Sequence, residues 1–115
     1  MNRGYIFYIK DIHDCICQIE KFTKGMAFSD FVKDDKTNSA VVRKLEIMGE
    51  ATKNIPLEIK QKCPDLPWTD MAKMRDKIIH SYFVVDQEIV WKTIKEKLPE
   101  MMPKIKKMLT DLYSQ

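Results

Sequence analysis

The sequence has little of the material that interrupts regular structure: three glycines and five prolines in 115 residues. So few turn-forming residues favour a mostly helical fold. Hydrophobic residues make up 44% and charged residues 32% of the chain, the mixture of a folded globular protein rather than a disordered one. We expect a single domain over residues 1–115, because this length allows a real core but not two.

Long apolar runs are also missing. No stretch approaches the roughly 18 to 20 apolar residues of a membrane span. The N-terminal stretch 1–10 reaches the charged pair Lys10 and Asp11 too soon for a signal peptide. We therefore expect a cytoplasmic protein that does not associate with membranes.

Cysteines are few and odd in number: Cys15, Cys17 and Cys63. A Cys-x-Cys pair without a further Cys or His at ligand spacing is weak evidence for zinc. Reduced, mostly buried thiols are the interpretation we prefer. We expect neither a metal nor a cofactor.

Charge of one sign does not accumulate strongly, since the net charge is only +3. The lysines of the C-terminal segment alternate with acidic residues: Lys92, Lys95, Lys97, Lys104, Lys106 and Lys107 against Asp86, Glu88, Glu96, Glu100 and Asp111. This near balance indicates a solvated helix face, and a basic stripe for nucleic acid is the alternative.

Apolar residues recur at spacings of three and four, the period of an amphipathic helix. The patterns predict helices over 5–22, from 37 or 38 to 55, over 68–79 and over 87–112, with a polar connection at 34–39 and a kink or a junction of two helices near prolines 99 and 103. The expected fold is all-α, a compact four- to five-helix up-and-down bundle.

The chemistry of the chain is concentrated in residues 71–83, which hold Arg75, Asp76, His80 and Tyr82. If this stretch is helical, Arg75 and Tyr82 share one face, and Asp76 and His80, four apart, share the neighbouring one. Asp76 could then orient the imidazole of His80 as a general acid or base near neutral pH.

Arg75 offers a planar, permanently charged group that binds phosphate through two nitrogens. An arginine with an oriented histidine points to cleavage of RNA, whose 2′-hydroxyl is an internal nucleophile, so that no metal is needed. The alternative is an ordinary salt-bridging helix surface, because Arg and His five apart also occur by chance.

Four further residues could belong to a site or to ordinary structure. Glu50 and Asn54, four apart, either face the Arg75 site or form an exposed pair on their helix. Gly49, in the middle of the same helix, marks either a close helix approach or a tolerated surface glycine. His13, beside Asp14, is interpreted as a surface or boundary residue rather than a ligand.

The spacing Arg75-x4-His80-x-Tyr82 resembles the motif of the HepT-like branch of the HEPN superfamily, small helical toxins paired with minimal nucleotidyltransferase antitoxins. Three sequence segments are also similar to that family in order and spacing: residues 49–56 (GEATKNIP), Pro67-Trp68, and residues 71–86 (MAKMRDKIIHSYFVVD). The resemblance covers nearly the whole chain, and the motif shows no departure from the family pattern.

The resemblance implies a helical bundle that dimerises, with the two motif copies meeting in a cleft where Arg75 and His80 cleave RNA without a metal. It implies the toxin of a type VII-like toxin–antitoxin system, neutralised by a nucleotidyltransferase antitoxin that attaches AMP to Tyr82. Tyr82 could instead stack on an RNA base or be a partly buried aromatic residue.

Residue chemistry is consistent with a dimer. Cleavage of RNA benefits from a base and an acid, and only His80 lies in a plausible site, so a two-fold partner would supply the second imidazole. The rival functions are a non-catalytic helical subunit that binds substrate or nucleotide for a separate nucleotidyltransferase, and a structural adaptor. Both the enzyme and the binding subunit need Arg75, and only the enzyme needs His80.

Overall fold

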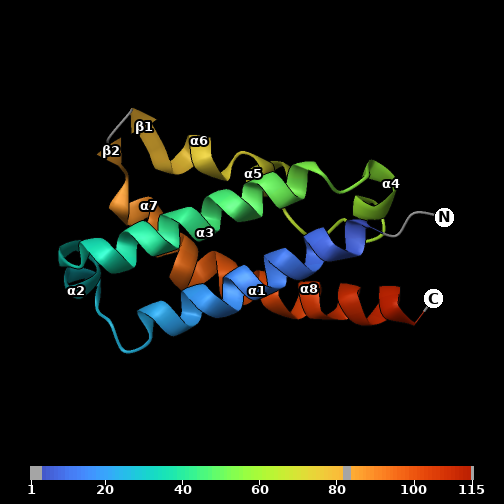
Figure 1. Ribbon diagram of the computed structural model, residues 1–115, viewed down its shortest axis with the longest axis horizontal. Helices are drawn as coiled ribbons and strands as arrows, with labels where there is room; N and C mark the ends of the chain where they lie inside the picture. Colours follow the sequence, from blue (N-terminus) through green and yellow to red (C-terminus); the bar gives the residue numbers. More distant parts are fainter. Residues whose placement is uncertain (1–3, 82–83, 115) are drawn as a thin grey trace.

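The computed structural model describes residues 4–81 and 84–114, and nearly all of them lie in helices (Figure 1). In chain order the elements are α1 (Tyr5–Thr23), α2 (Phe28–Lys33), α3 (Asp35–Lys53), α4 (Leu57–Lys60), α5 (Trp68–Ala72), α6 (Met74–Ile78), β1 (Ile79–Ser81), β2 (Val84–Val85), α7 (Gln87–Lys92), the π-helical turn η1 (Thr93–Lys97) and α8 (Leu98–Tyr113). The predicted all-α class is confirmed, and β1 and β2 are the only strands in the described ranges. None of the helices described is both long and apolar enough to cross a membrane.

Three long helices form the body of the molecule. Figure 1 shows α1, α3 and α8 running along its long axis, and α1 packs against both of the others. The short helices α5 and α6 lie against α3. The fully buried side chains between these layers are Ile9, Ile12, Ile16, Ile19, Phe31, Val41, Leu45, Met48, Met71, Ile78, Val90, Leu98 and Ile105.

The beginning of α3 differs from the prediction. The segment 34–39 was expected to be a polar connection, yet the helix already begins at Asp35. Asp34 caps it, because its carboxylate accepts hydrogen bonds from the backbone nitrogen and the hydroxyl of Thr37, at 2.9 and 2.7 Å. These hydrogen bonds lower the pKa of Asp34 below its usual value. The polar residues taken for a linker are the cap and first turn of the helix.

Gly49 marks a close approach of helices, which decides between the two alternatives. A Cβ atom built at this position would lie 3.2 Å from the carbonyl oxygen of Met71 and 3.7 Å from that of Ala72. The missing side chain therefore lets the backbone of α5 lie directly against α3. This contact sets the distance between α3 and the segment that continues into α6.

The C-terminal region is two abutting helices, as predicted, but they are joined by the π turn η1. The backbone N–H of Leu98 donates to the carbonyl oxygen of Thr93, five residues back. Pro99 explains the wider turn, because its ring would clash with the carbonyl four residues earlier in a regular α-helix. Pro103 lies inside α8.

Candidate active site

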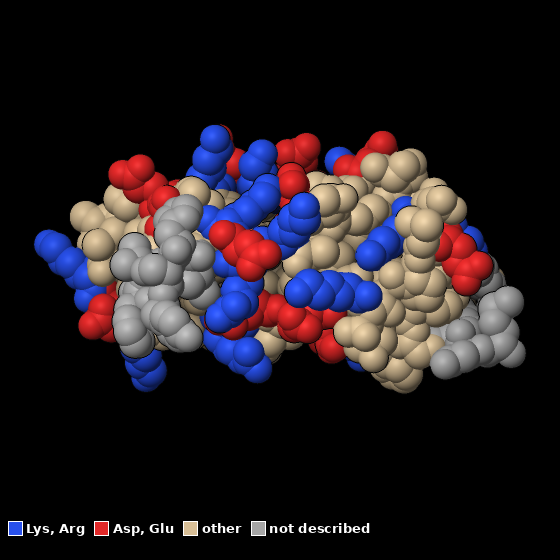
Figure 2. All heavy atoms as spheres, turned by 90° about the horizontal axis from the view of Figure 1, so that it is seen from above, with Lys and Arg blue, Asp and Glu red and all other residues tan. Residues whose placement is uncertain are grey.

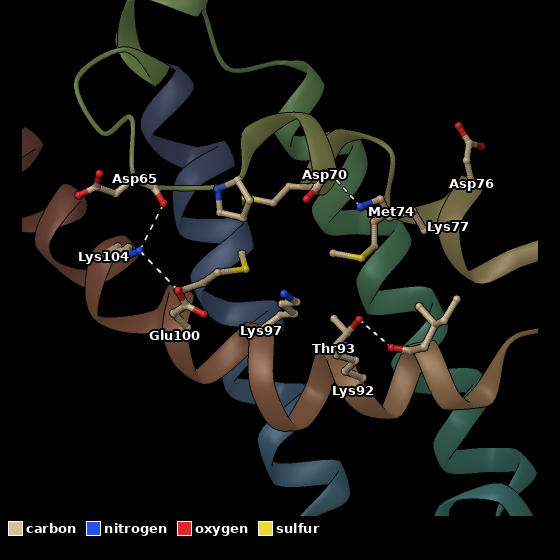
Figure 3. Close-up of a pocket in the computed structure, with 14 residues that line it drawn as sticks. Asp65, Asp70, Met74, Asp76, Lys77, Lys92, Thr93, Lys97, Glu100 and Lys104 are labelled. Atoms are coloured by element: carbon tan, nitrogen blue, oxygen red, sulfur yellow. Dashed lines mark hydrogen bonds and ion pairs between the residues drawn. The ribbon is translucent and has the colours of Figure 1, made fainter.

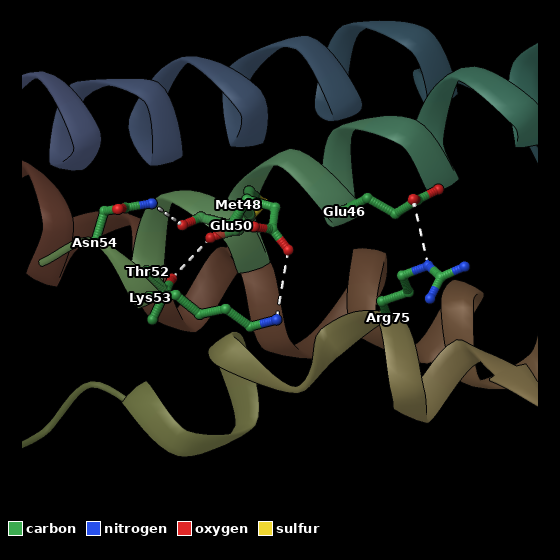
Figure 4. A network of polar contacts seen from close by, with 7 residues as sticks. All are labelled: Glu46, Met48, Glu50, Thr52, Lys53, Asn54 and Arg75. Carbon is green, nitrogen blue, oxygen red and sulfur yellow. Dashed lines mark hydrogen bonds and ion pairs between the residues drawn. The ribbon is translucent and has the colours of Figure 1, made fainter.

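Arg75 lies on α6, which is fixed to the core by its two buried ends, Met74 and Ile78. Its Nε atom lies 3.6 Å from Oε2 of Glu46 on α3 (Figure 4). The side chain of Arg75 is 66% exposed and that of Glu46 is 27% exposed. Arg75 is thus held at the base of its guanidinium and open to solvent at the other end.

The Arg75–Glu46 contact orients a phosphate-binding group. Oε2 of Glu46 lies 3.6 Å from Nε, and two-thirds of the Arg75 side chain is exposed to solvent. Two parallel N–H groups on one edge of a guanidinium suit two oxygens of one phosphate. The arrangement therefore leaves Arg75 able to bind an incoming phosphodiester.

Glu46 is absent from the residues predicted for the site because no sequence pattern pairs it with Arg75. It lies 29 positions before Arg75, so no local spacing connects them. Gly49 could have indicated this pairing. It lies three residues after Glu46 and therefore on the same face of α3, and this face packs against α5. An acidic residue beside such a close approach is within reach of the next segment.

Glu50 and Asn54 do not contact Arg75. The Asn54 side chain donates to the backbone oxygen of Glu50 at 2.9 Å, and the Glu50 carboxylate lies 3.4 Å from Nζ of Lys53 (Figure 4). Both side chains interact within α3, which agrees with the alternative of an exposed helix surface.

Asp76 follows Arg75 on α6 but faces a different part of the molecule. It lines a hollow between α5 and α6 on one side and α7, η1 and α8 on the other, which we call the α6–α8 groove. Its neighbour Lys77 lies 2.8 Å from Asp70 of α5, and this hydrogen bond lowers the pKa of Asp70 below its usual value.

The helical interpretation of the whole motif is wrong. α6 ends at Ile78, and His80 belongs to strand β1, where Ile79 pairs with Val85. Asp76 and His80 are therefore not one turn apart on a helix. The shared face expected for Arg75 and Tyr82 involves Tyr82, which lies outside the described residues. Successive β-branched isoleucines at the end of α6 favour extended backbone.

Two of the predicted site groups lie outside the described part of the structure. These are the side chain of His80 and the whole of Tyr82. The residues on either side of this segment are joined by a hydrogen bond: the backbone N–H of Asp86 donates to the carbonyl oxygen of Ile78 at 2.7 Å. Asp86 also caps α7 by accepting from the Ile89 N–H.

The other histidine and the cysteines are placed as boundary and core groups. The His13 ring on α1 lies 3.0 Å from Asp14 and 3.9 Å from the sulfur of Cys17. Cys15 is buried, Cys17 and Cys63 are half-buried, and burial raises the pKa of the Cys15 and Cys63 thiols. Within the described residues no three His, Cys, Asp or Glu side chains form a group that could hold a metal ion.

The surface above α5 and α6 carries charges of both signs. Figure 2 shows lysine and arginine side chains interspersed with acidic ones over the middle of this face. Nearby opposite charges reduce the long-range attraction that this face exerts on a polyanion.

Comparison with known proteins identifies relatives over almost the full length. The ribonuclease HepT-like family model matches residues 12–108. The chain is 49% identical over 108 residues to a protein of Thermococcus cleftensis named "Probable ribonuclease HepT", covering 94% of this chain and 98% of that protein. It is 45% identical to a protein of Caldanaerobacter subterraneus named as a candidate RNase, over 93% of each chain. A third relative, from Methanocaldococcus jannaschii and also named as a candidate RNase, is 41% identical over 91% of this chain and 87% of its own length. No solved structure matches the chain.

Proposed function

The chain belongs to the ribonuclease HepT-like family of endoribonucleases, and we propose that it is the toxin of a type VII-like toxin–antitoxin pair that cleaves RNA without a metal ion. The observation that carries the proposal is the placement of Arg75. It lies on a short helix whose two end residues are buried, contacts Glu46, and is followed five residues later by His80. RNA is the substrate and Arg75 and His80 are the proposed catalytic residues.

The proposed reaction needs no outside nucleophile. His80 accepts the proton of the 2′-hydroxyl while that oxygen attacks the adjacent phosphorus, and a second acid protonates the departing 5′-oxygen. Arg75 stabilises the negative charge that grows on the phosphate oxygens. The products are one strand ending in a 2′,3′-cyclic phosphate and one beginning with a 5′-hydroxyl.

A homodimer is part of the proposal, because one chain offers only one histidine to the site. An isologous dimer would bring a second His80 to the same cleft, one as base and the other as acid. Light scattering that shows a strict monomer, together with RNA cleavage by that monomer, would contradict the composite cleft.

Purified protein is expected to cleave single-stranded RNA in excess EDTA as fast as in Mg²⁺, and to leave cyclic phosphate ends. Mass spectrometry of the fragments identifies these ends. The matched control is an oligonucleotide of the same sequence with 2′-deoxy sugars, which lacks the nucleophile and should stay intact. Cleavage of the deoxy substrate, or cleavage only with added metal, would refute the mechanism.

Glu46→Gln is expected to lower kcat about fivefold without raising KM, since an exposed pair of this kind is worth up to about 1 kcal/mol. The amide keeps the shape but loses the charge that orients Nε, while the positive charge that attracts phosphate remains. Glu50→Gln is the matched control, because Glu50 lies one turn further on α3 and contacts Lys53. Equal kcat in the wild type and Glu46→Gln would show that Glu46 does not position Arg75.

A further inference from the structure

The carboxylate that the sequence assigns to His80 is Asp76, and the structure separates the two. A histidine that acts as base or acid works best when a carboxylate accepts from one ring nitrogen, because this fixes the tautomer and raises the basicity of the other nitrogen. Asp76 could do so only along a continuous helix, and α6 ends at Ile78. Asp76 lines the α6–α8 groove, and Figure 3 shows its carboxylate beside α6, pointing away from the hollow.

A different carboxylate, that of Asp86, belongs to a residue bonded to the backbone at the start of β1. The N–H of Asp86 donates to the carbonyl oxygen of Ile78 at 2.7 Å, so these two residues lie opposite each other where the strands meet the helices. His80 is two residues beyond Ile78 on β1. Residues in such a diagonal relation across an antiparallel pair have Cβ atoms about 7 Å apart, within reach of an aromatic ring.

The backbone of β1 is irregular at His80. Ile79 pairs with Val85 and Ser81 pairs with Val84, so β1 has one residue more than β2 between the two pairs, and that residue is His80. An extra residue of this kind bends its strand and changes the direction of side chains, and such bulges are frequent beside active sites. The regular alternation of a strand therefore does not decide which way this position faces.

The Asp86 carboxylate is held from the other side by α7. Asp86 is half-buried, and its Oδ1 accepts the backbone N–H of Ile89 at 3.1 Å. A carboxylate has about four lone-pair positions on its two oxygens, so capping a helix is compatible with accepting from an imidazole. The other charged side chains on α6 and α7 are all exposed: Arg75, Asp76, Lys77, Glu88 and Lys92.

We propose that Asp86 is the positioning residue of the site. Its carboxylate accepts a hydrogen bond from one ring nitrogen of His80 and leaves the other nitrogen to take or give the proton in RNA cleavage. This role rests on the proposed ribonuclease function. Asp86 forms no bond to the substrate and takes no proton in the reaction; it holds the imidazole in one tautomer and one orientation.

The first test is a proton NMR titration of the two histidines in the wild type and in Asp86→Asn. Asparagine caps a helix as well as aspartate does, so this substitution removes the charge and keeps the cap of α7. A nearby carboxylate favours the protonated imidazole. The His80 signals of Asp86→Asn are therefore expected to titrate at lower pH than those of the wild type, and the His13 signals should not move. His13→Ala assigns the two sets of signals.

The second test is the rate of RNA cleavage. Asp86→Asn is expected to lower kcat about tenfold or more with little change of KM, as part of the roughly 10²- to 10⁴-fold that a general acid or base supplies. The pH profile of the variant should shift to lower pH, in the same direction as the titration. In a His80→Ala background Asp86→Asn should cost nothing further, because the two residues act as one unit.

Asp34→Asn is the matched control, because Asp34 caps α3 in the same way, through the backbone N–H of Thr37. Circular dichroism and the melting temperature verify that each variant folds. A titration and a kcat of Asp86→Asn equal to those of Asp34→Asn, with an RNA-cleaving wild type, would overturn the role of Asp86 alone. A shifted titration in Asp76→Asn and none in Asp86→Asn would return the role to Asp76. A wild type that does not cleave RNA would overturn the proposed function, and the titration would still decide whether Asp86 pairs with His80.

Discussion

Replacing His80 with alanine is expected to abolish growth arrest and RNA loss in cells that express this protein, and to slow RNA cleavage by about 10²- to 10⁴-fold in vitro. That range is the usual contribution of one general acid or base. In a two-fold cleft the same substitution removes both imidazoles, so the upper part of the range is expected. The measurements are the growth rate, the integrity of total RNA and the cleavage rate of purified protein.

The control for this experiment is the other histidine of the chain. His13→Ala changes a half-buried ring on α1, beside Asp14, and should leave toxicity and cleavage at the wild-type level. Soluble protein levels must be matched, and mass analysis must exclude modification of Tyr82 by the host. Equal growth and intact RNA with the wild type and His80→Ala would then favour the alternative of a non-catalytic binding subunit.

The family resemblance implies an antitoxin that attaches AMP to Tyr82, and Tyr82→Phe is then expected to abolish this attachment when the protein is co-expressed with a minimal nucleotidyltransferase. Phenylalanine lacks the hydroxyl oxygen that would attack the α-phosphorus of ATP and release pyrophosphate. The phenol has an ordinary pKa near 10, so the partner must supply the base and the metal. Intact mass should show one adenylate per wild-type chain and none on the variant, and the variant should resist neutralisation by the partner.

Tyr113→Phe is the matched control, because Tyr113 is 61% exposed and its hydroxyl is therefore accessible to a partner enzyme. This variant should still gain one adenylate. Absence of any mass increase on the wild type, or an increase that survives Tyr82→Phe, would refute the attachment of AMP to Tyr82.

The helical class and the family could be predicted because their signals are local. Isoleucines at positions 9, 12, 16 and 19 show the helix period directly, and all four are fully buried in α1. The family resemblance rested on short sequence motifs in a fixed order, and the family match over residues 12–108 confirms it. Helix periodicity and short motifs can both be recognised in a sequence without knowing which helices are in contact.

The failures concern places where tertiary contacts decide the local structure. The helix predicted over 68–79 does end at Ile78, but it is interrupted at Lys73, where the sequence has no strong helix breaker. The Asp86–Ile78 hydrogen bond, which closes the segment containing β1 and β2, joins residues that no helix period relates. The pairing of Arg75 with Glu46 depends in the same way on how α6 packs on α3. The identities of the candidate residues were accessible from sequence, but their spatial arrangement was not.

The close contact at Gly49 has a consequence for genetics. A side chain at this position would press against the Met71 carbonyl and push α5, and α6 behind it, away from α3. Arg75 would then move away from Glu46 although neither residue had been changed. A random mutagenesis screen scored by toxicity would thus recover Gly49 substitutions among the inactive alleles, next to those of Arg75. In such a screen Gly49 would resemble a catalytic residue, although its role is to keep α3 and α5 close together.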